Sequence, residues 1–237
     1  MSTISDPEIS KSDAPIQVPM PDLVKFVRQL GHDLRNHLNA AELQAAYLAE
    51  IVKDPEASDE IKRLRAMISQ VGTSLQSVTV ALGHPRLMLM DYGTADFVAD
   101  LRQKLATEYP NETIEWNIQA GDDSIEIDPQ ALQPALIELF ANAFRHDRGE
   151  GPVTVDARVE DGRFAFVIHE PKRTFDRPTE NWGREPMRTV TQGHYGLGLH
   201  RSRAILEAHH GQFSARYDNA NSSLITTVTL PLSNKRA

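Results

Sequence analysis

The organisation of this chain follows from residues 22–53, which read DLVKFVRQLGHDLRNHLNAAELQAAYLAEIVK. Apolar side chains recur there at steps of three and four residues, which places them along one side of a helix. They are Leu23, Val27, Leu30, Leu34, Leu38, Ala41, Ala45 and Leu48. Asp54-Pro55 ends the segment, because the residue before a proline disfavours helical backbone. The stretch therefore predicts one long amphipathic helix.

A second segment with the same periodicity follows after a short loop, and Ser58 is placed to cap it. Its apolar residues are Ile61, Leu64, Ile68, Val71, Leu75, Val78 and Leu82, and Gly83-His84-Pro85 ends it. Two such helices form a helical hairpin, and one hairpin cannot cover both apolar seams. We expect a homodimer in which two hairpins make a four-helix bundle. The alternative is that the hairpin packs only on the rest of its own chain.

The remainder of the chain mixes helical and strand patterns, which predicts an α+β fold with a second, layered α/β-sandwich domain. The expected elements are helices over 95–109, from Asp128-Pro129 onward and over 196–209, and strands over 113–118, 153–159, 163–168, 212–217 and 223–230. The polar stretch 169–195 is too long for an ordinary connector and is expected to be a binding loop or lid. The expected domains are a mobile tail at 1–21, the hairpin domain at 22–90 and the layered domain at 91–237.

Composition excludes several classes of protein. The 237 residues include 25 Lys and Arg against 33 Asp and Glu, and this acidic balance argues against sequence-independent nucleic-acid binding. The chain has no Cys, which excludes disulfides, thiolate catalysis and Cys-based zinc sites. No apolar run approaches the length of a membrane span, and the N-terminus has no signal-peptide pattern. We expect a cytoplasmic protein without membrane insertion.

His32 is the first candidate for chemistry. With about 100° of turn per residue, it lies about 200° from Leu30, away from the apolar seam. Asn36 follows one turn later on the same side, and Asp33 is adjacent in sequence. A carboxylate at that place orients one imidazole nitrogen and leaves the other nucleophilic. Taken alone, an exposed histidine on a helix is more often only a polar surface residue.

Two further groups of residues suit a phosphorylated ligand. Glu138 and Asn142 are four residues apart on the polar face of the helix that begins at Asp128, and oxygen-bearing side chains there suit Mg²⁺ together with phosphate oxygens. Arg145 can pair with phosphate, although a plain solvated helix face is the alternative. The glycines at 193, 196 and 198 precede a helix, and glycines let backbone N–H groups approach phosphate closely.

Taken together, these motifs resemble those of sensor histidine kinases. Residues 31–39, GHDLRNHLN, are similar to the H-box, residues 137–146, IELFANAFRH, to the N-box, and residues 193–211 to the last glycine box and its helix. The resemblance implies that His32 is the phosphoacceptor, that Asp33 assists its deprotonation and that Asn36 positions water for dephosphorylating a partner. It also implies an ATP site in which Asn142 holds Mg²⁺, with Glu138 as a possible second ligand. The remaining ATP-binding residues that it implies are Arg145, Gly193, Gly196 and Gly198.

The first glycine box departs from the family pattern. In the family this box is Asp-x-Gly-x-Gly, and its Asp accepts a hydrogen bond from the adenine amino group. Here the Asp position aligns with His169, or with Glu170 if the register slips by one residue, and both glycines are missing. Losing such a buried polar contact costs about 1–3 kcal/mol, so ATP binding is expected to be weakened or lost.

The resemblance leaves three functions open. The first is a two-component histidine kinase that uses ATP and Mg²⁺, phosphorylates His32 and passes the phosphoryl group to an Asp of a response-regulator receiver domain. Because only a short tail precedes the hairpin, its sensor is then expected on another chain. The second is a histidine phosphotransferase of a phosphorelay whose ATP-binding domain is a relic. The third is a non-catalytic dimeric scaffold for a response regulator.

Overall fold

The computed structural model describes residues 18–145, 148–184 and 196–233. The chain divides into two compact units that meet between Thr79 and Val80. Most of the expected N-terminal tail lies outside the described residues. Within the described ranges, no helix combines the length and the hydropathy that crossing a membrane requires.

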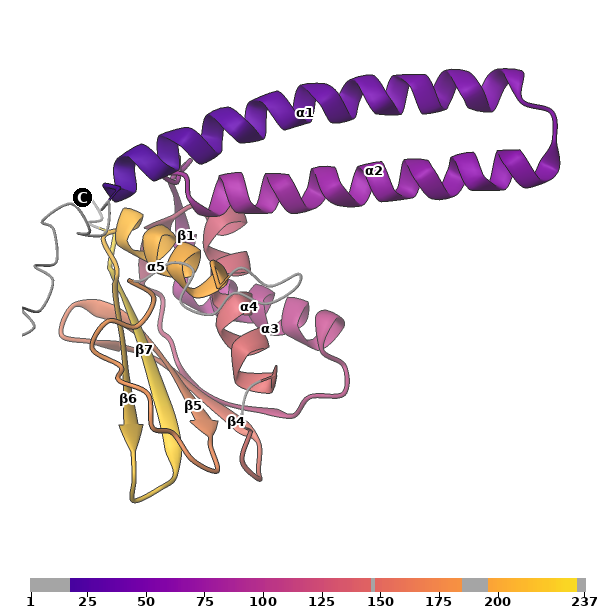
Figure 1. The fold of residues 1–237 in the computed structure, drawn as a ribbon. Coiled ribbons are helices and arrows are strands. Elements are labelled where there is room, and N and C mark those ends of the chain that lie inside the picture. Colours follow the sequence, from indigo (N-terminus) through magenta and orange to yellow (C-terminus); the bar gives the residue numbers. More distant parts are fainter. Residues whose placement is uncertain (1–17, 146–147, 185–195, 234–237) are drawn as a thin grey trace, which may run out of the picture. The chain divides into compact units, whose positions relative to one another are not determined.

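The first unit is a helical hairpin made of α1 (Met20–Ile51) and α2 (Pro55–Ala81) (Figure 1). The expectation that Ser58 caps the second helix was wrong, because α2 begins three residues earlier. The cap is Asp54, whose Oδ2 accepts the Ala57 backbone N–H at 2.9 Å. Pro55 suits the first helical position, where its missing N–H is not needed.

The two helices of the hairpin approach each other closely at Gly31. A Cβ on this residue would lie 2.7 Å from Thr79 Oγ1, so the absence of a side chain permits the approach. An ion pair between Arg65 and Glu42, 2.7 Å from Nη2 to Oε1, joins the helices farther along. These cross-helix contacts set how α1 and α2 align, and hence where His32 is presented.

The second unit is a five-stranded sheet with helices on one face (Figure 1). Its elements are β1 (Met90–Gly93), α3 (Thr94–Glu108), β2 (Ile114–Gln119), β3 (Ser124–Ile127), α4 (Pro129–Arg145), β4 (Val153–Glu160), β5 (Arg163–Pro171), α5 (Gly198–Ala208), β6 (Gln212–Asp218) and β7 (Ser223–Pro231). The sheet order is β2-β4-β5-β7-β6, with β2 and β4 parallel and the other neighbours antiparallel. The expected α+β class, a helical hairpin followed by a layered α/β domain, is confirmed.

Two features differ from the pattern that the sequence predicts. The short antiparallel pair β1 and β3 was not expected, because strands of four residues are too short to show an alternation. Strand β5 runs on to Pro171 instead of ending at Ile168, since Ser223 and Leu224 of β7 continue the pairing. The first three residues of the expected loop therefore belong to the sheet.

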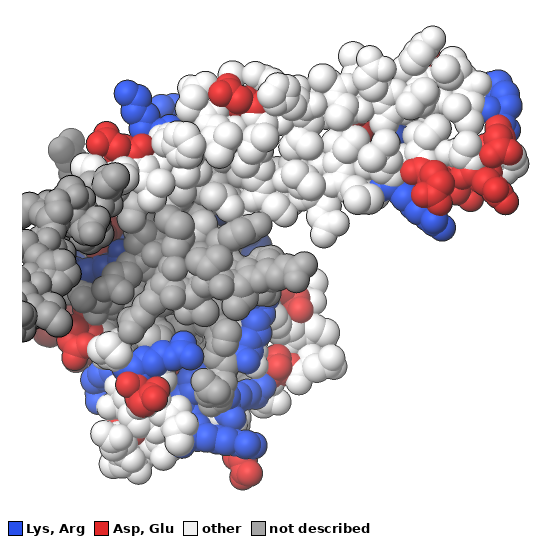
Figure 2. Space-filling model, in the orientation of Figure 1, with Lys and Arg blue, Asp and Glu red and all other residues white. Residues whose placement is uncertain are grey.

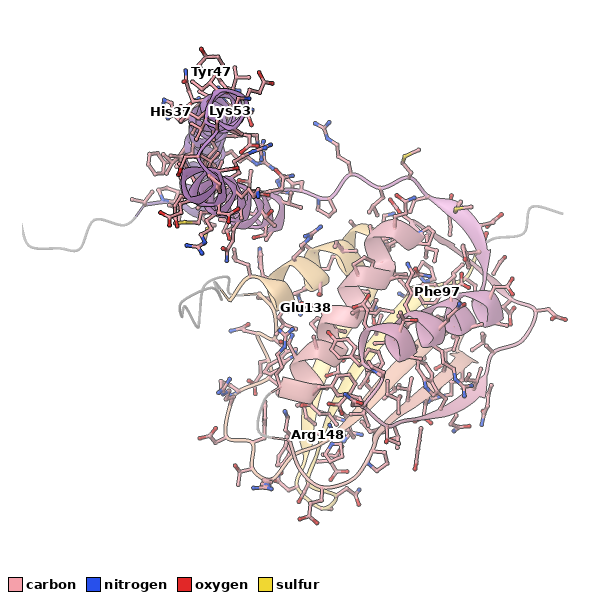
Figure 3. The ribbon with its side chains drawn as sticks, turned by 90° about the vertical axis from the view of Figure 1, so that its right-hand side faces the viewer. His37, Tyr47, Lys53, Phe97, Glu138 and Arg148 are labelled. Carbon is pink, nitrogen blue, oxygen red and sulfur yellow. The ribbon has the colours of Figure 1, made fainter. Side chains whose placement is uncertain are left out.

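The core of this unit lies between the sheet and the helices, and aromatic side chains dominate it. Phe97 of α3, labelled in Figure 3, meets Phe164 of β5 edge to face at 6.4 Å between ring centroids. Phe140 of α4 meets Phe166 of β5 in the same way at 6.2 Å. All four are at most 1% exposed. Each buried aromatic contributes about 1.5–3 kcal/mol, so β5 and α4 are firmly held against each other.

Candidate functional site

His32 stands on the exposed side of α1, as the helical geometry predicts. Its side chain is 66% exposed, and Nδ1 lies 3.2 Å from Asp33 Oδ1. Asn36 Nδ2 lies 3.5 Å from the same ring nitrogen, at the outer limit of hydrogen bonding. Gln29 Nε2 donates to Asp33 Oδ1 at 2.9 Å and holds that carboxylate in place. With a proton on Nδ1 directed at Asp33, the exposed Nε2 carries the lone pair.

The hairpin around His32 carries a broad apolar surface. Figure 2 shows a long uncharged stretch over the hairpin, with charged side chains gathered at the end where α1 and α2 join. Large apolar side chains that are exposed on the hairpin include Phe26, Leu30, Leu34, Leu43, Tyr47, Leu48, Ile51, Leu64, Met67 and Val71. Such a surface on a single chain marks an interaction site.

In the second unit, two residues of the expected phosphate site, Glu138 and Gly198, meet where α4 packs on the start of α5. The Glu138 carboxylate lies directly against Gly198, so that a Cβ on Gly198 would overlap it. Ser202 Oγ donates to Ala135 O at 2.9 Å, which fixes one helix on the other. Figure 3 shows Glu138 on the α4 side that faces α5. The N-terminus of α5 thus offers favourable polarity for anions beside a carboxylate.

Asn142 belongs to the same junction. The two contacts just described make α4 and α5 antiparallel, so Asn142 lies one turn beyond Glu138, toward the residues that precede α5. Gly196 has a φ of +62°, a backbone conformation that glycine adopts without strain. Arg145, the last residue of α4, is exposed. Gly193 lies outside the described residues, as does the last part of the expected lid, residues 185–195.

The donor set at this junction fits Mg²⁺ only together with a phosphate. Within the described ranges, no three His, Asp or Glu side chains converge as a metal site of their own. An Asn oxygen and one carboxylate supply too few ligands alone, but Mg²⁺ ordinarily completes its shell with phosphate oxygens and water. The residues present therefore fit Mg²⁺ bound to a nucleotide.

At the end of β5 the structure separates His169 from Glu170. His169 points to the sheet face away from the helices, where Nε2 lies 2.8 Å from Asp156 Oδ2. Asp156 in turn accepts a hydrogen bond from Asn117 at 2.9 Å. Because side chains alternate along a strand, Glu170 shares the opposite face with Phe166 and lies on the side of α4. The structure therefore does not bring His169 together with Asn142, and it favours Glu170 at the position of the family's Asp.

Glu170 is paired within its own strand end. Its carboxylate forms an ion pair with Lys172, and the two residues are only 6% and 4% exposed. Burial raises the pKa of Glu170, while the neighbouring charges of Lys172 and Arg148 oppose the rise. Lys172 was not among the residues predicted from the sequence, although its spacing of two residues from Glu170 puts both on one face if the backbone stays extended.

Arg148 lies beyond the end of α4, near the Glu170–Lys172 pair (Figure 3). It forms an ion pair with Glu112, and its guanidinium lies 5.7 Å from the centre of the Phe144 ring. Its neighbour Gly149 donates its N–H to Pro171 O at 2.8 Å. The chain after α4 is thereby attached to the end of β5.

A buried histidine fixes the start of α4. His209 Nδ1 donates to Ile205 O at 2.8 Å, and Nε2 accepts the Asp128 N–H at 3.0 Å. Burial lowers the pKa of His209, which favours the neutral ring that these two bonds need. The Asp128 carboxylate caps α4 as expected, accepting N–H groups of Gln130 and Ala131 at 3.0 and 3.1 Å.

The known proteins that this chain resembles include several sensor histidine kinases. Residues 127–234 match the histidine kinase-, DNA gyrase B- and HSP90-like ATPase family. An uncharacterised sensor-like histidine kinase of Rhizobium meliloti is 25% identical over 224 residues, which are 87% of this chain and 42% of the relative. The sensor protein kinase WalK of Staphylococcus haemolyticus is 24% identical over 233 residues, 87% of this chain and 36% of the relative. This chain thus spans less than half the length of either relative.

Solved structures share the fold. Full-length ShkA in complex with AMPPNP aligns with a TM-score of 0.65 at 18% identity, over 90% of this chain and 47% of ShkA. ThkA in complex with the response regulator TrrA aligns with a TM-score of 0.57 at 15% identity, over 92% of this chain and 64% of the matched chain. The family match places residues 127–234 in the histidine kinase-like ATPase family, and the relatives and the shared fold support assignment of the chain to the sensor histidine kinase superfamily.

Proposed function

We propose that this chain transfers the γ-phosphoryl group of ATP to His32 and then to an Asp of a response-regulator receiver domain. The observation that carries the proposal is the His32–Asp33 contact on an exposed helix face. It stands on the same chain as an ATPase-family domain whose phosphate-side residues suit Mg²⁺ and a nucleotide. A histidine alone, or the ATPase fold alone, would not support this reaction.

The chemistry at His32 needs one lone pair and one proton acceptor. The Nε2 lone pair forms the new bond to the γ-phosphorus. The bond from that phosphorus to the bridging oxygen breaks, and its electrons leave with ADP. Asp33 Oδ1, 3.2 Å from Nδ1, accepts the proton of that nitrogen as positive charge develops on the ring. We assign to Asn36 the orientation of the water that hydrolyses the phosphoryl group on the Asp of the receiver domain.

At the nucleotide, the chain's contribution is positioning and electrostatics. We assign the phosphates to the N-terminus of α5, because the first backbone N–H groups of a helix and its dipole favour anions. Asn142 and Glu138 would hold Mg²⁺, which would neutralise charge on the phosphate oxygens. Arg145 and the glycines at 193 and 196 stay proposed phosphate contacts, and His169 is the weakest member of the proposed set because its side chain points away from α4.

We also propose a homodimer formed through the hairpin. The apolar surface of α1 and α2 supports it, since Leu43, Tyr47 and Met67 are 72%, 58% and 62% exposed in a single chain. A four-helix bundle would bury these side chains and leave His32 exposed to a receiver domain.

The test is labelling of the purified chain with Mg²⁺ and γ-labelled ATP. We expect a label that acid removes and base does not, lost in His32→Ala and retained in His37→Ala. His37 is a matched control because it is also an exposed histidine on α1, five residues away. Label that persists in His32→Ala would overturn the assignment of the acceptor.

A second function, phosphotransfer without ATP, is favoured by one observation: the Glu170–Lys172 ion pair at the base end of the ATP site. A folded dimer that takes no label from ATP but takes it at His32 from a phosphorylated receiver would establish this function instead. Receiver binding without phosphotransfer, equal in His32→Ala and wild type, would indicate the scaffold.

A further inference from the structure

The end of β5 carries a feature that the family pattern does not. Where the family has an Asp followed by glycines, this chain has Glu170 near the end of β5 and Lys172 two residues later, just beyond the strand in a bridge with Arg148. The two charged groups are paired with each other and nearly fully buried. Removing two charges from water costs several kcal/mol per ion unless each compensates the other. Each of the two buried charges therefore needs the other, because either one alone would be left uncompensated.

Backbone contacts on both sides of Lys172 hold it beside Glu170. The Lys172 backbone N–H donates to Ser222 O at 2.8 Å, and Gly149 donates to Pro171 O at the same distance. A Cβ on Gly149 would lie 2.9 Å from Lys172 N and 3.0 Å from Pro171 C. The backbone on both sides of Lys172 is thus fixed by neighbours at contact distance.

The ammonium of Lys172 and the amino group of adenine have the same hydrogen-bonding role. Both donate N–H to a carboxylate, and a buried carboxylate between protein groups has room for few donors. The ammonium forms the stronger bond, because it also attracts the carboxylate as an opposite charge in this buried place, whereas the base amino group is neutral. A base amino group therefore competes at a disadvantage for Glu170.

We propose that Lys172 occupies the place of the base amino group, so that this domain binds nucleotides through their phosphates without reading the amino group of adenine. This inference rests on the proposal that the domain binds a nucleotide at all. It concerns only the base end of the site, because Glu138, Asn142 and Gly198 at the phosphate end fit the ligand. Lys172 thus determines base specificity, because its ammonium takes the place at Glu170 where a base amino group would bind.

The test compares two nucleotides on the full chain by calorimetric titration with Mg²⁺. ATP is one, and purine riboside triphosphate, which lacks only the 6-amino group, is the other. For the wild type we expect affinities within about three-fold of each other. Lys172→Met keeps the length of the side chain and removes its donor, so Glu170 becomes available. We expect that variant to bind ATP at least about ten-fold more tightly, the equivalent of one hydrogen bond to a charged group, with little change for the analogue.

The matched control is Arg173→Met, which removes an exposed cation one residue away and should leave both affinities unchanged. A wild-type preference for ATP of ten-fold or more would overturn the inference. So would a folded Lys172→Met chain without the gain, or undetectable binding of both nucleotides to both chains. If the variant does not fold, the wild-type comparison decides. Failure of His32 labelling with nucleotide binding intact would overturn the proposed kinase and leave this inference standing.

Discussion

Replacing Asp128 with alanine is expected to destabilise the ATPase domain by about 2–3 kcal/mol. Its carboxylate accepts three backbone N–H groups, from Met88 at 2.9 Å, Gln130 at 3.0 Å and Ala131 at 3.1 Å. Losing a helix cap costs about 1 kcal/mol. Losing the bond that holds the segment before β1 adds about 1–2 kcal/mol, because the acceptor is charged. For a unit of this size, the melting temperature should fall by roughly 5–10 °C.

Tryptophan fluorescence during urea denaturation isolates the effect, because both tryptophans, Trp116 and Trp182, lie in the second unit. Glu160→Ala, which removes an exposed ion pair with Arg158, is the control and should change stability by less than about 1 kcal/mol. A loss of stability in Asp128→Ala no larger than in this control would show that the three hydrogen bonds to its carboxylate do not stabilise the domain. The hydrogen bond from Met88 is the main cause that lowers the pKa of Asp128. The stabilisation is therefore present above the unfolded pKa of 3.8 and is lost as pH falls through the lower folded pKa.

Three further changes test other parts of the structure. Because burial lowers the pKa of His209, the unfolded chain protonates first. The stabilisation is then present above about pH 6.5 and lost below it, and His209→Gln should flatten the pH dependence of urea denaturation between pH 7.5 and 5.5. Gly149→Ala should cost about 1–3 kcal/mol in the same assay, because the new Cβ meets the Lys172 backbone; unchanged stability would contradict this packing. Leu43→Glu should yield monomers in analytical ultracentrifugation, whereas Lys62→Glu at the charged end of the hairpin should stay dimeric.

The sequence was sufficient wherever a regular pattern or a specific turn residue determined the backbone. The periodicity of α1 and α2, the cap at Asp128 and the turn at Asp161 and Gly162, whose φ values are +50° and +70°, all follow from local rules. The hairpin's own loop was less predictable. Asp54-Pro55 is both a helix stop and a good helix start, and a pattern alone does not show how few residues separate the two roles.

The candidate site shows the same division. The placement of His32 and Asp33 depends on one helix, so spacing alone predicted their orientation. His169 and Glu170 depend on the register of β5, and shifting a strand by one residue moves every side chain to the other face. The extension of β5 to His169 and Glu170 is supported by pairing with Ile225 and Leu224 of β7, more than fifty residues away in the chain. The spacing of Glu170 and Lys172 indicates a shared face only once this extension is known, and no local signal in the sequence shows it.

The most direct measurement is phosphorus NMR of the chain after incubation with Mg²⁺ and ATP, with peptide mapping of the modified residue. It distinguishes the two nitrogens of a phosphorylated imidazole. Because Asp33 engages Nδ1 and Nε2 is exposed, we expect one phosphohistidine, at residue 32, with phosphorus on Nε2. Phosphorus on Nδ1, or on another histidine while His32 stays unmodified, would contradict it.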